Sequence, residues 1–352
     1  MSLSQMSGYL YRFLYPVLSS IPAEFSHELV IKILSLISGA LPETDYRREV
    51  KMGKVILYNP VGIGAGIDKN AEALEGWFKL GAGFVCVGTA TPRPQKGNPS
   101  PRIFRLKKEK SIINWLGFNN DGITNILRRI DRAKFRKTVG ISIGKNADTP
   151  LEDAWQDYQY CCRESAHSSV DYVEINISSP NTEGLTRLQS PAHLKKIINT
   201  CYDELAKSRE TKGFFVKISP DLSRKEIEQI AKVLNESPID AVVICNTTRK
   251  IAETGHERGG LSGLLLRPIA FAVHSMFRKF LSPDIPVIAS GGIMDEVDSF
   301  WRRKLGAKAV YLVTGLIYRG PSLIKRILDN WDREMSEIPP PEITYPAFLK
   351  LD

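Results

Sequence analysis

Eight short runs of β-branched and small apolar residues recur along the chain from residue 61 onward, and amphipathic stretches separate most of them. Apolar runs of this length, flanked by glycine, proline and polar residues, predict buried strands. The expected strands cover residues 61–66, 84–90, 139–144, 172–178, 214–219, 241–247, 286–292 and 309–315. Parallel strands require crossover connections of a dozen residues or more, and most of these intervals are long enough. The pattern predicts an α/β fold, specifically a (β/α)8 barrel.

An open doubly wound sheet is the alternative fold, and it would carry G-x-G-x-x-G between the first strand and its helix. The glycines of "GIGAG", residues 62–66, instead fall inside the expected first strand, where they indicate close packing. In a barrel, the active site lies at the carboxyl ends of the strands. These ends are polar or glycine-rich in all eight runs. They include Asp68, Lys69, Thr89, Ser142, Lys145, Asn146, Asn176 to Asn181, Lys217, Asn246, Thr247, Gly291, Gly292, Thr314 and Gly315.

The net charge of +9 is compatible with anionic partners, but the basic residues are spread along the chain. With no zinc-ligand spacing or nucleic-acid-binding motif, we expect no nucleic-acid partner. Five cysteines without a C-x-x-C pair argue against a disulfide framework and fit a reducing compartment. Asn176, Ile177 and Ser178 also match an N-glycosylation pattern, which such a compartment would leave unmodified.

The N-terminal region is rich in apolar residues. Arg12 and Pro16 interrupt its first segment, so we expect no cleaved signal peptide. The second segment predicts an amphipathic helix, because these apolar residues recur at helical spacing: Phe25, Leu29, Ile33, Leu36 and Ile37. Two interpretations remain open: a helix docked on the core, or a cap that enters a membrane interface. We expect a helical cap over 1–45, a barrel over 46–340 and a tail over 341–352.

The strand ends favour a particular chemistry. Lys69 and Lys217 would place positive charge in the mouth, which suits a bound anion or electron-rich ring, although a salt bridge at the rim is the alternative for either. Glycine pairs near the last strands indicate a phosphate-bearing cofactor. Asparagine amides both donate and accept, so a set of them suits a planar polar ring rather than a metal. The set comprises Asn114, Asn176, Asn181 and Asn246.

No histidine falls at an expected strand end, so a proton acceptor would have to be serine, threonine or lysine. Ser179 follows the fourth strand. Without a histidine beside it, this serine is a poor nucleophile for acyl transfer. It can still relay a proton when water or a developing charge assists it.

Several segments, in this order and spacing, resemble class 2 dihydroorotate dehydrogenases, which are membrane-associated and quinone-dependent. They are "NPVGIGAGIDKNAE", "VGTATPRPQKGNPSPRIFRL", "INWLGFNNDG", "INISSPNTEGLTRLQ", "VKISPDL", "NTT", "GGLSG" and "GLIYRGPSLIKRIL". The resemblance covers nearly the whole chain. It implies FMN-dependent oxidation of (S)-dihydroorotate to orotate, with a membrane quinone as electron acceptor, in pyrimidine (UMP) biosynthesis. We expect peripheral attachment to the cytoplasmic face of a bacterial inner membrane, since no clear Arg-rich transit segment is present.

The resemblance also implies roles for single residues. Ser179 matches the base that removes a proton from C5 while C6 passes hydride to the flavin, and Lys69 and Lys217 assist. The FMN positions are Ala65, Gly66, Lys69, Thr89, Ser142, Asn176, Lys217, Cys245, Gly263, Gly292, Val313 and Thr314. The pyrimidine positions are Lys69, Asn114, Trp115, Leu116, Gly117, Phe118, Asn176, Asn181, Asn246 and Thr247. His27 and Arg105 match the quinone side, and no metal is implied.

The chain departs from the family pattern at a few positions. Ser142 stands where asparagine is usual, Cys245 where threonine is usual, and Val313-Thr314 where Tyr-Ser is usual. These departures gather on the flavin and quinone side. They leave two alternatives: a diverged FMN barrel oxidoreductase with another dihydropyrimidine or acceptor, and a flavin-free binding protein.

Overall fold

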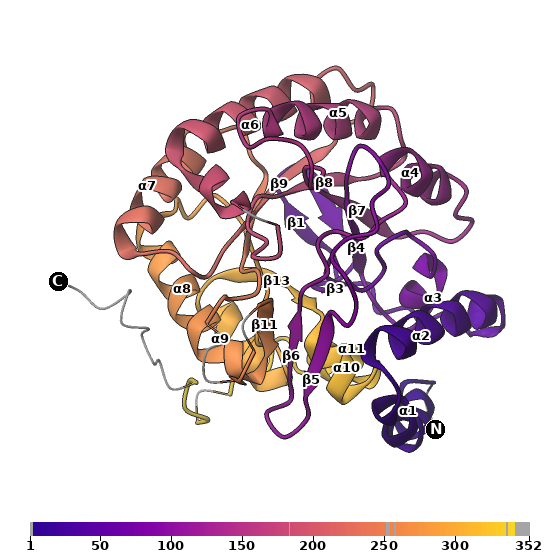
Figure 1. Cartoon of the computed structure of the whole chain (residues 1–352). Helices are drawn as coiled ribbons and strands as arrows, with labels where there is room; N and C mark the ends of the chain where they lie inside the picture. The colour runs from indigo at the N-terminus through magenta and orange to yellow at the C-terminus, as the bar shows by residue number, and fades with distance from the viewer. Residues whose placement is uncertain (1–2, 183, 251–253, 257, 336, 342–352) are drawn as a thin grey trace.

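Eight parallel strands close into a barrel in the order β3-β4-β7-β8-β9-β10-β12-β13, and β13 pairs with β3 (Figure 1). The computed structural model describes residues 3–182, 184–250, 254–256, 258–335 and 337–341. The strands are β3 (Val61–Ile63), β4 (Phe84–Ala90), β7 (Thr138–Ile143), β8 (Tyr172–Asn176), β9 (Gly213–Ile218), β10 (Ala241–Ile244), β12 (Val287–Ala289) and β13 (Ala307–Leu312). Each lies within or overlaps one expected run, and the predicted (β/α)8 barrel is confirmed.

Helices cover the outside of the barrel, as parallel connections require (Figure 1). α7 begins at a capping box in which Ser223 and Glu226 each accept the other's backbone N–H. The outer helices are α3 (Leu74–Lys79), α4 (Ile123–Asp131), α5 (Ala154–Ala166), α6 (Pro191–Leu205), α7 (Arg224–Asn235), α8 (Arg267–Phe280), α9 (Glu296–Lys304) and α11 (Ser322–Asp329). A short α10 (Thr314–Arg319) directly follows the last strand.

Several strands end earlier than the sequence predicts. β8 ends at Asn176 rather than residue 178, and β10 ends at Ile244 rather than residue 247. β3 ends at Ile63, and Gly66 beyond it has a left-handed φ of 104°. The polar and glycine residues of these runs therefore leave the strand ladder and form loops at the carboxyl end of the barrel.

A short hairpin, β1 (Val50–Met52) and β2 (Val55–Leu57), packs against the residues inside the barrel. Met52, Val55 and Leu57 are buried with inward-facing side chains of β4, β8 and β9. Gly62 leaves room for the Phe84 ring, since a Cβ at Gly62 would stand 2.5 Å from Phe84 Cζ. The close packing expected around "GIGAG" is thus present at Gly62, and hydrophobic residues fill the barrel interior on this side.

A second sheet of three antiparallel strands, which the sequence did not predict, has the order β11-β6-β5. Its strands are β5 (Ile103–Leu106), β6 (Ser111–Asn114) and β11 (Gly260–Gly263). Figure 1 shows this sheet in front of the barrel strands, next to the helices of the N-terminus. It brings Arg105, Asn114 and Gly263 to one side of the barrel mouth.

Two N-terminal helices, α1 (Leu3–Ser20) and α2 (Ala23–Ile37), lie beside the barrel (Figure 1). Ile31 and Leu34 are the buried hydrophobic residues of α2. Gly76 of α3 admits this contact, since a Cβ there would lie 2.4 Å from Leu34 Cγ. The expected apolar face is largely exposed instead: Phe25 and Leu36 are 58% and 76% accessible. One face of α2 is therefore docked on the core, and the other face is exposed.

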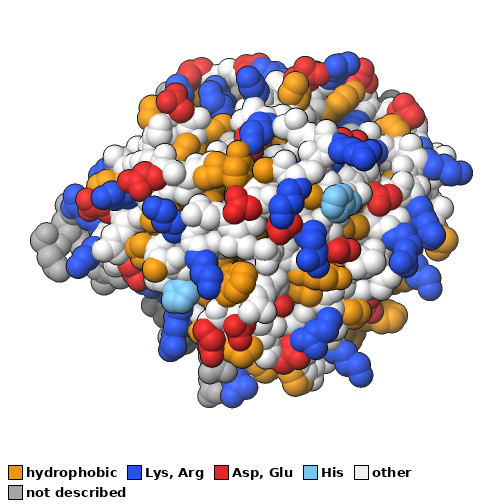
Figure 2. All heavy atoms as spheres, turned by 90° about the horizontal axis from the view of Figure 1, so that it is seen from above, with side chains coloured by type: hydrophobic (Ala, Val, Ile, Leu, Met, Phe, Trp, Pro, Cys, Tyr) orange, Lys and Arg blue, Asp and Glu red, His pale blue; other side chains and the backbone are white. Residues whose placement is uncertain are grey.

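No helix in the described part of the chain is long and apolar enough to cross a bilayer. Figure 2 shows Lys and Arg interspersed with Asp and Glu on one face of the molecule. All five cysteines are buried and unpaired. Residues 342–352 of the expected C-terminal tail lie outside the described residues.

Candidate active site

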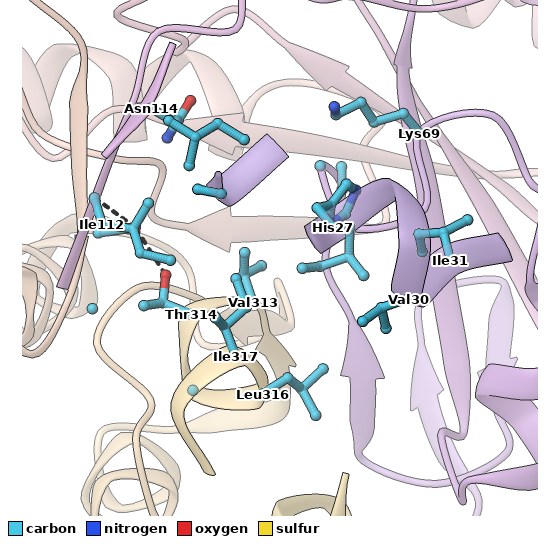
Figure 3. A pocket seen from close by; sticks show the side chains of 18 of the residues that line it. His27, Val30, Ile31, Lys69, Ile112, Asn114, Val313, Thr314, Leu316 and Ile317 are labelled. Carbon is cyan, nitrogen blue, oxygen red and sulfur yellow. Dashed lines mark hydrogen bonds between the residues drawn. The ribbon is translucent and has the colours of Figure 1, made fainter. Parts of the chain in front are cut away.

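A cavity of about 660 Å³ lies between the barrel mouth and helices α1 and α2. Figure 3 shows α2 on one side of it, carrying His27, Val30 and Ile31, with the segment from Val313 to Ile317 facing that helix. The cavity therefore joins the carboxyl ends of the barrel strands to the N-terminal helices.

Nearly all of the residues predicted for the site line this one cavity. They are His27, Ala65, Gly66, Lys69, Thr89, Arg105, Asn114, Leu116, Gly117, Phe118, Asn176, Ser179, Asn181, Lys217, Cys245, Asn246, Thr247, Gly263, Gly292, Val313 and Thr314. Two predicted residues do not line it. Ser142 is fully buried behind Thr89, and Trp115 lines a separate cavity.

Asn176, the last residue of β8, is held in a chain of hydrogen bonds. Its Nδ2 donates to Thr89 Oγ1 at 2.9 Å, and this hydroxyl lies 3.2 Å from the Ser142 hydroxyl. The Tyr158 hydroxyl donates to the Asn176 carbonyl at 2.9 Å. Ser142, which stands where asparagine is usual, therefore contacts Thr89 and not the cavity. The Thr89 side chain lies between Ser142 and the cavity.

Ser178, for which no role was predicted, connects two of the asparagines. Asn246 Nδ2 donates to Ser178 Oγ at 3.0 Å and lies 3.2 Å from Asn176 Oδ1. The Ser178 hydroxyl donates to the same Asn176 oxygen at 3.1 Å. These bonds fix the amide planes of Asn176 and Asn246 before any ligand binds. The adjacent serines in "NISSPNT" were the available signal, but they do not show which hydroxyl faces the cavity.

Two further asparagines of the lining are also paired: Asn181 Nδ2 donates to Asn114 Oδ1 at 2.7 Å, and Asn114 Nδ2 donates to the Gly260 carbonyl at 3.3 Å. The oxygen Asn181 Oδ1 is buried without a hydrogen-bond partner in the described structure. Such an acceptor is costly to bury unless something donates to it. Ser179 lies in the same loop, and its Oγ accepts the Asn181 N–H at 3.3 Å. The arrangement is suited to a planar ligand that carries N–H groups.

Lys69 and His27 both line the cavity (Figure 3). Burial lowers the pKa of Lys69 to about 8, which keeps the amine mainly protonated at neutral pH. Burial, reinforced by the charge of Lys69, lowers the pKa of His27 to about 4. His27 is therefore neutral at pH 7, and Lys69 supplies the positive charge there.

Three further residues bear on the departures from the family pattern. Cys245 lines the cavity, and burial raises the pKa of its thiol to about 12, so it stays protonated. Val313 packs closely against Gly64: a Cβ added at Gly64 would lie 2.9 Å from Val313 Cγ2. The Thr314 hydroxyl donates to Ser262 Oγ at 2.8 Å, which ties α10 to the β11 strand. All three residues line the cavity.

The end of the cavity near α1 is held by Arg105. Its guanidinium donates to the Ile21 carbonyl at 2.7 Å and to the Ser26 hydroxyl. Arg105 thereby fixes the connection between α1 and α2. Among the described residues, no cluster of three or more His, Cys, Asp or Glu side chains is placed to hold a metal ion.

The fold and the site define a (β/α)8 enzyme whose mouth is built for a planar, polar, anionic ring. The sequence model of the dihydroorotate dehydrogenase family matches residues 48–335. This match spans most of the chain, so the chain belongs to the dihydroorotate dehydrogenase family.

Relatives and solved structures agree with this assignment. The chain is 40% identical over 324 residues to dihydroorotate dehydrogenase (quinone) of Neisseria meningitidis serogroup B, covering 89% of this chain and 96% of that one. It is 41% identical over 331 residues to the enzyme of that name from Nitrosomonas eutropha, covering 90% and 96%. The crystal structure of Eimeria tenella DHODH with ferulenol superposes with a TM-score of 0.81 at 36% identity, covering 89% and 93%.

Proposed function

We propose that this protein oxidises (S)-dihydroorotate to orotate and passes the electrons to a quinone, in the de novo synthesis of UMP. The observation that carries the proposal is the single cavity in which Ser179, the asparagine amides and Lys69 meet the N-terminal helices. Membership of the family and the names of the relatives supply the reaction.

The substrate side follows from the hydrogen-bond partners that remain open. Asn181 Oδ1 would accept an N–H of the pyrimidine ring, because it is buried with no donor of its own among the described residues. Lys69 would balance the substrate carboxylate. The Ser179 hydroxyl, buried in the same wall, would take the proton from C5. Holding the ring rigidly against these groups accounts for much of the expected rate enhancement.

The residues present fit a flavin, and we propose FMN. A Cβ at Gly66 would meet nothing within 4 Å, so the backbone there borders open space in which a ring system fits. Lys217 is buried at the cavity wall, where its amine would offset negative charge on a bound ring. At the other end, Gly263, Gly292 and Thr314 border the cavity and would hold the phosphate. When bound, the flavin would accept the hydride from C6 of dihydroorotate.

We further propose that the N-terminal helices admit the quinone and attach the protein peripherally to a membrane. Exposed large apolar side chains on α1 and α2 support this, because such groups favour an interface. Five unpaired buried thiols fit the cytoplasmic side, and the bacterial relatives named above fit a bacterial inner membrane.

The test is the flavin spectrum of the purified protein. We expect a yellow protein that bleaches when dihydroorotate is added without oxygen and regains its colour when a quinone analogue follows. A colourless protein that takes up no FMN would overturn the proposal. Fumarate and NAD, supplied in place of quinone, should reoxidise the flavin far more slowly; the reverse result would reassign the acceptor.

A further inference from the structure

The barrel interior below the cavity contains a buried pair of opposite charges. Glu174 on β8 is fully buried, and its Oε1 lies 3.8 Å from Lys217 Nζ on β9. Lys217 is among the residues that line the cavity, whereas Glu174 is not. In the strand register Lys217 lies opposite Asn176, and Glu174 points to the same side of β8 as Asn176, roughly 7 Å further down the strand. The carboxylate therefore lies one layer deeper in the barrel than the cavity wall.

Three ionisable side chains beside this pair are neutral at pH 7. The hydroxyls of Tyr172 and Tyr311 lie 2.8 Å apart, and the Lys217 ammonium lies 5.9 Å from the centre of the Tyr311 ring. Burial raises the pKa of both hydroxyls and of the Cys86 thiol, so all three groups keep their protons. Hydrophobic residues of the β1–β2 hairpin pack beneath them. The interior here is therefore a low-dielectric environment in which Glu174 and Lys217 carry the charge.

Glu174 and Lys217 form an ion pair without a hydrogen bond. At 3.8 Å, the two atoms are farther apart than a hydrogen-bonded donor and acceptor. Both Glu174 oxygens also lack a hydrogen-bond partner among the described residues. A buried carboxylate is costly unless an opposite charge compensates it. Glu174 therefore depends on the charge of Lys217, and in return it offsets part of that charge at the cavity wall.

We propose that Glu174 is a positioning residue that acts through Lys217: by offsetting the lysine charge, it makes the bound flavin harder to reduce and easier to reoxidise. The inference rests on the proposed function, because it concerns the FMN proposed for this cavity. A hydride carries one negative charge, so its transfer from C6 of dihydroorotate adds to the negative charge that Lys217 would offset. The ammonium stabilises this added charge and the carboxylate opposes it, and both effects are strong in a low-dielectric site.

The two half-reactions respond to this charge in opposite directions. A lysine without its carboxylate would favour hydride transfer from dihydroorotate, but it would hold the electrons back from the quinone. Glu174→Gln, which removes the charge and keeps the shape, should therefore speed flavin reduction by dihydroorotate and slow reoxidation by a quinone analogue. A variant that merely disturbed the packing of the barrel would slow both half-reactions, which would contradict the proposal.

The direct test is the midpoint potential of the flavin in the holoenzyme, measured by equilibration with a reference redox dye. In Glu174→Gln, the equilibrium constant for reduction should rise at least about tenfold, which is about 30 mV for a two-electron couple. Glu228→Gln, an exposed substitution on α7, is the matched control and should leave the potential unchanged. Glu174→Asp keeps the charge and should stay close to the unaltered enzyme. Equal potentials in Glu174→Gln and Glu228→Gln would overturn the proposal.

A second pair of variants decides the question if Glu174→Gln alone does not fold. Lys217→Met should lower the potential, because the carboxylate is left without its partner. Adding Glu174→Gln to Lys217→Met should raise the potential again, towards that of the unaltered enzyme. A double variant with the same potential as Lys217→Met contradicts the proposal.

The dye equilibration needs neither dihydroorotate nor quinone, so it is independent of the proposed reaction. An unaltered enzyme that holds FMN but is not bleached by dihydroorotate would reject that reaction, and the potentials of the variants would still decide the role of Glu174. A protein that takes up no FMN would overturn both proposals.

Discussion

Lys217 Nζ lies 3.8 Å from Glu174 Oε1, and these two buried side chains come from the neighbouring strands β9 and β8. Neither oxygen of Glu174 has a hydrogen-bond partner in the described structure. Lys217 is therefore the ion-pair partner of Glu174 among the described residues. Removing one member of such a pair leaves a buried charge without its partner, which typically costs about 3–5 kcal/mol.

We expect Glu174→Gln to lower the free energy of unfolding of the FMN-free protein by about 3 kcal/mol, because Lys217 loses its buried counter-charge. Urea unfolding measures this change. Glu228→Gln, an exposed substitution on α7, should change the same quantity by less than about 0.5 kcal/mol. Equal midpoints for the two variants would show that the Lys217–Glu174 pair contributes nothing.

Ser179→Ala should slow flavin reduction by roughly 10²-fold to 10⁴-fold, since a positioned proton acceptor contributes about this much. Orotate binding should weaken by no more than about 1.5 kcal/mol, the value of one hydrogen bond. Stopped-flow bleaching and orotate titration measure the two effects. Ser178→Ala is the matched control: it loosens Asn176 and Asn246, so binding and reduction should fall together. If Ser179→Ala weakened orotate binding as much as it slowed flavin reduction, the proton acceptor would be another residue.

Burial sets the pH dependence expected for Lys69, whose pKa is lowered from 10.5 to about 8. As pH rises through 8, the free enzyme loses the charge that would bind the substrate carboxylate. Orotate affinity should therefore fall above pH 8, by up to about tenfold per pH unit. Orotate titrations between pH 6.5 and 9 test this, and Lys69→Met should bind weakly with a flat profile. A Lys69→Met profile that still falls above pH 8 would assign the effect to another group.

The contribution of Lys69 to the free energy of unfolding should change with pH in the direction opposite to orotate affinity. The folded pKa of Lys69 lies below its unfolded value, so between about pH 8 and 10.5 the unfolded chain binds the extra proton. The contribution of Lys69 to the free energy of unfolding therefore rises with pH in this window and is at its lowest below pH 8. Urea unfolding of the FMN-free protein at pH 7.5 and 9.5, with Lys69→Met as reference, measures this difference.

The exposed face of α2 gives a separate prediction. Phe25→Glu combined with Leu36→Glu should reduce binding to phospholipid vesicles and turnover with a long-chain quinone, because both side chains are exposed on that helix. Flavin bleaching by dihydroorotate should not change. Ile56→Glu, an equally exposed apolar position on the β1–β2 hairpin, serves as the control and should leave vesicle binding intact. Loss of binding in the control alone would move the contact to the other end of the barrel.

Much of the barrel was predictable because its strands are buried on both faces, except at Lys308 of β13, and read as short apolar runs. The strands of the second sheet were missed, since β5 is only half-buried along its length and contains Arg105. The sequence placed Ser142 and Trp115 in the site, but it does not show that Thr89 separates Ser142 from the cavity or that Trp115 faces outward. Glu174 was overlooked because its partner Lys217 lies on another strand, and only strand register brings them together.

The β1–β2 hairpin closes the amino-terminal side of the barrel to the reactants. With hydrophobic side chains filling that side, both reactants must arrive over the opposite rim. One of them dissolves in water and the other in lipid. The rim carries the polar loops that follow the strands on one flank and the exposed apolar side chains of α1 and α2 on the other. Under the proposed membrane attachment, with only the N-terminal flank against the bilayer, a single barrel end would serve two immiscible phases.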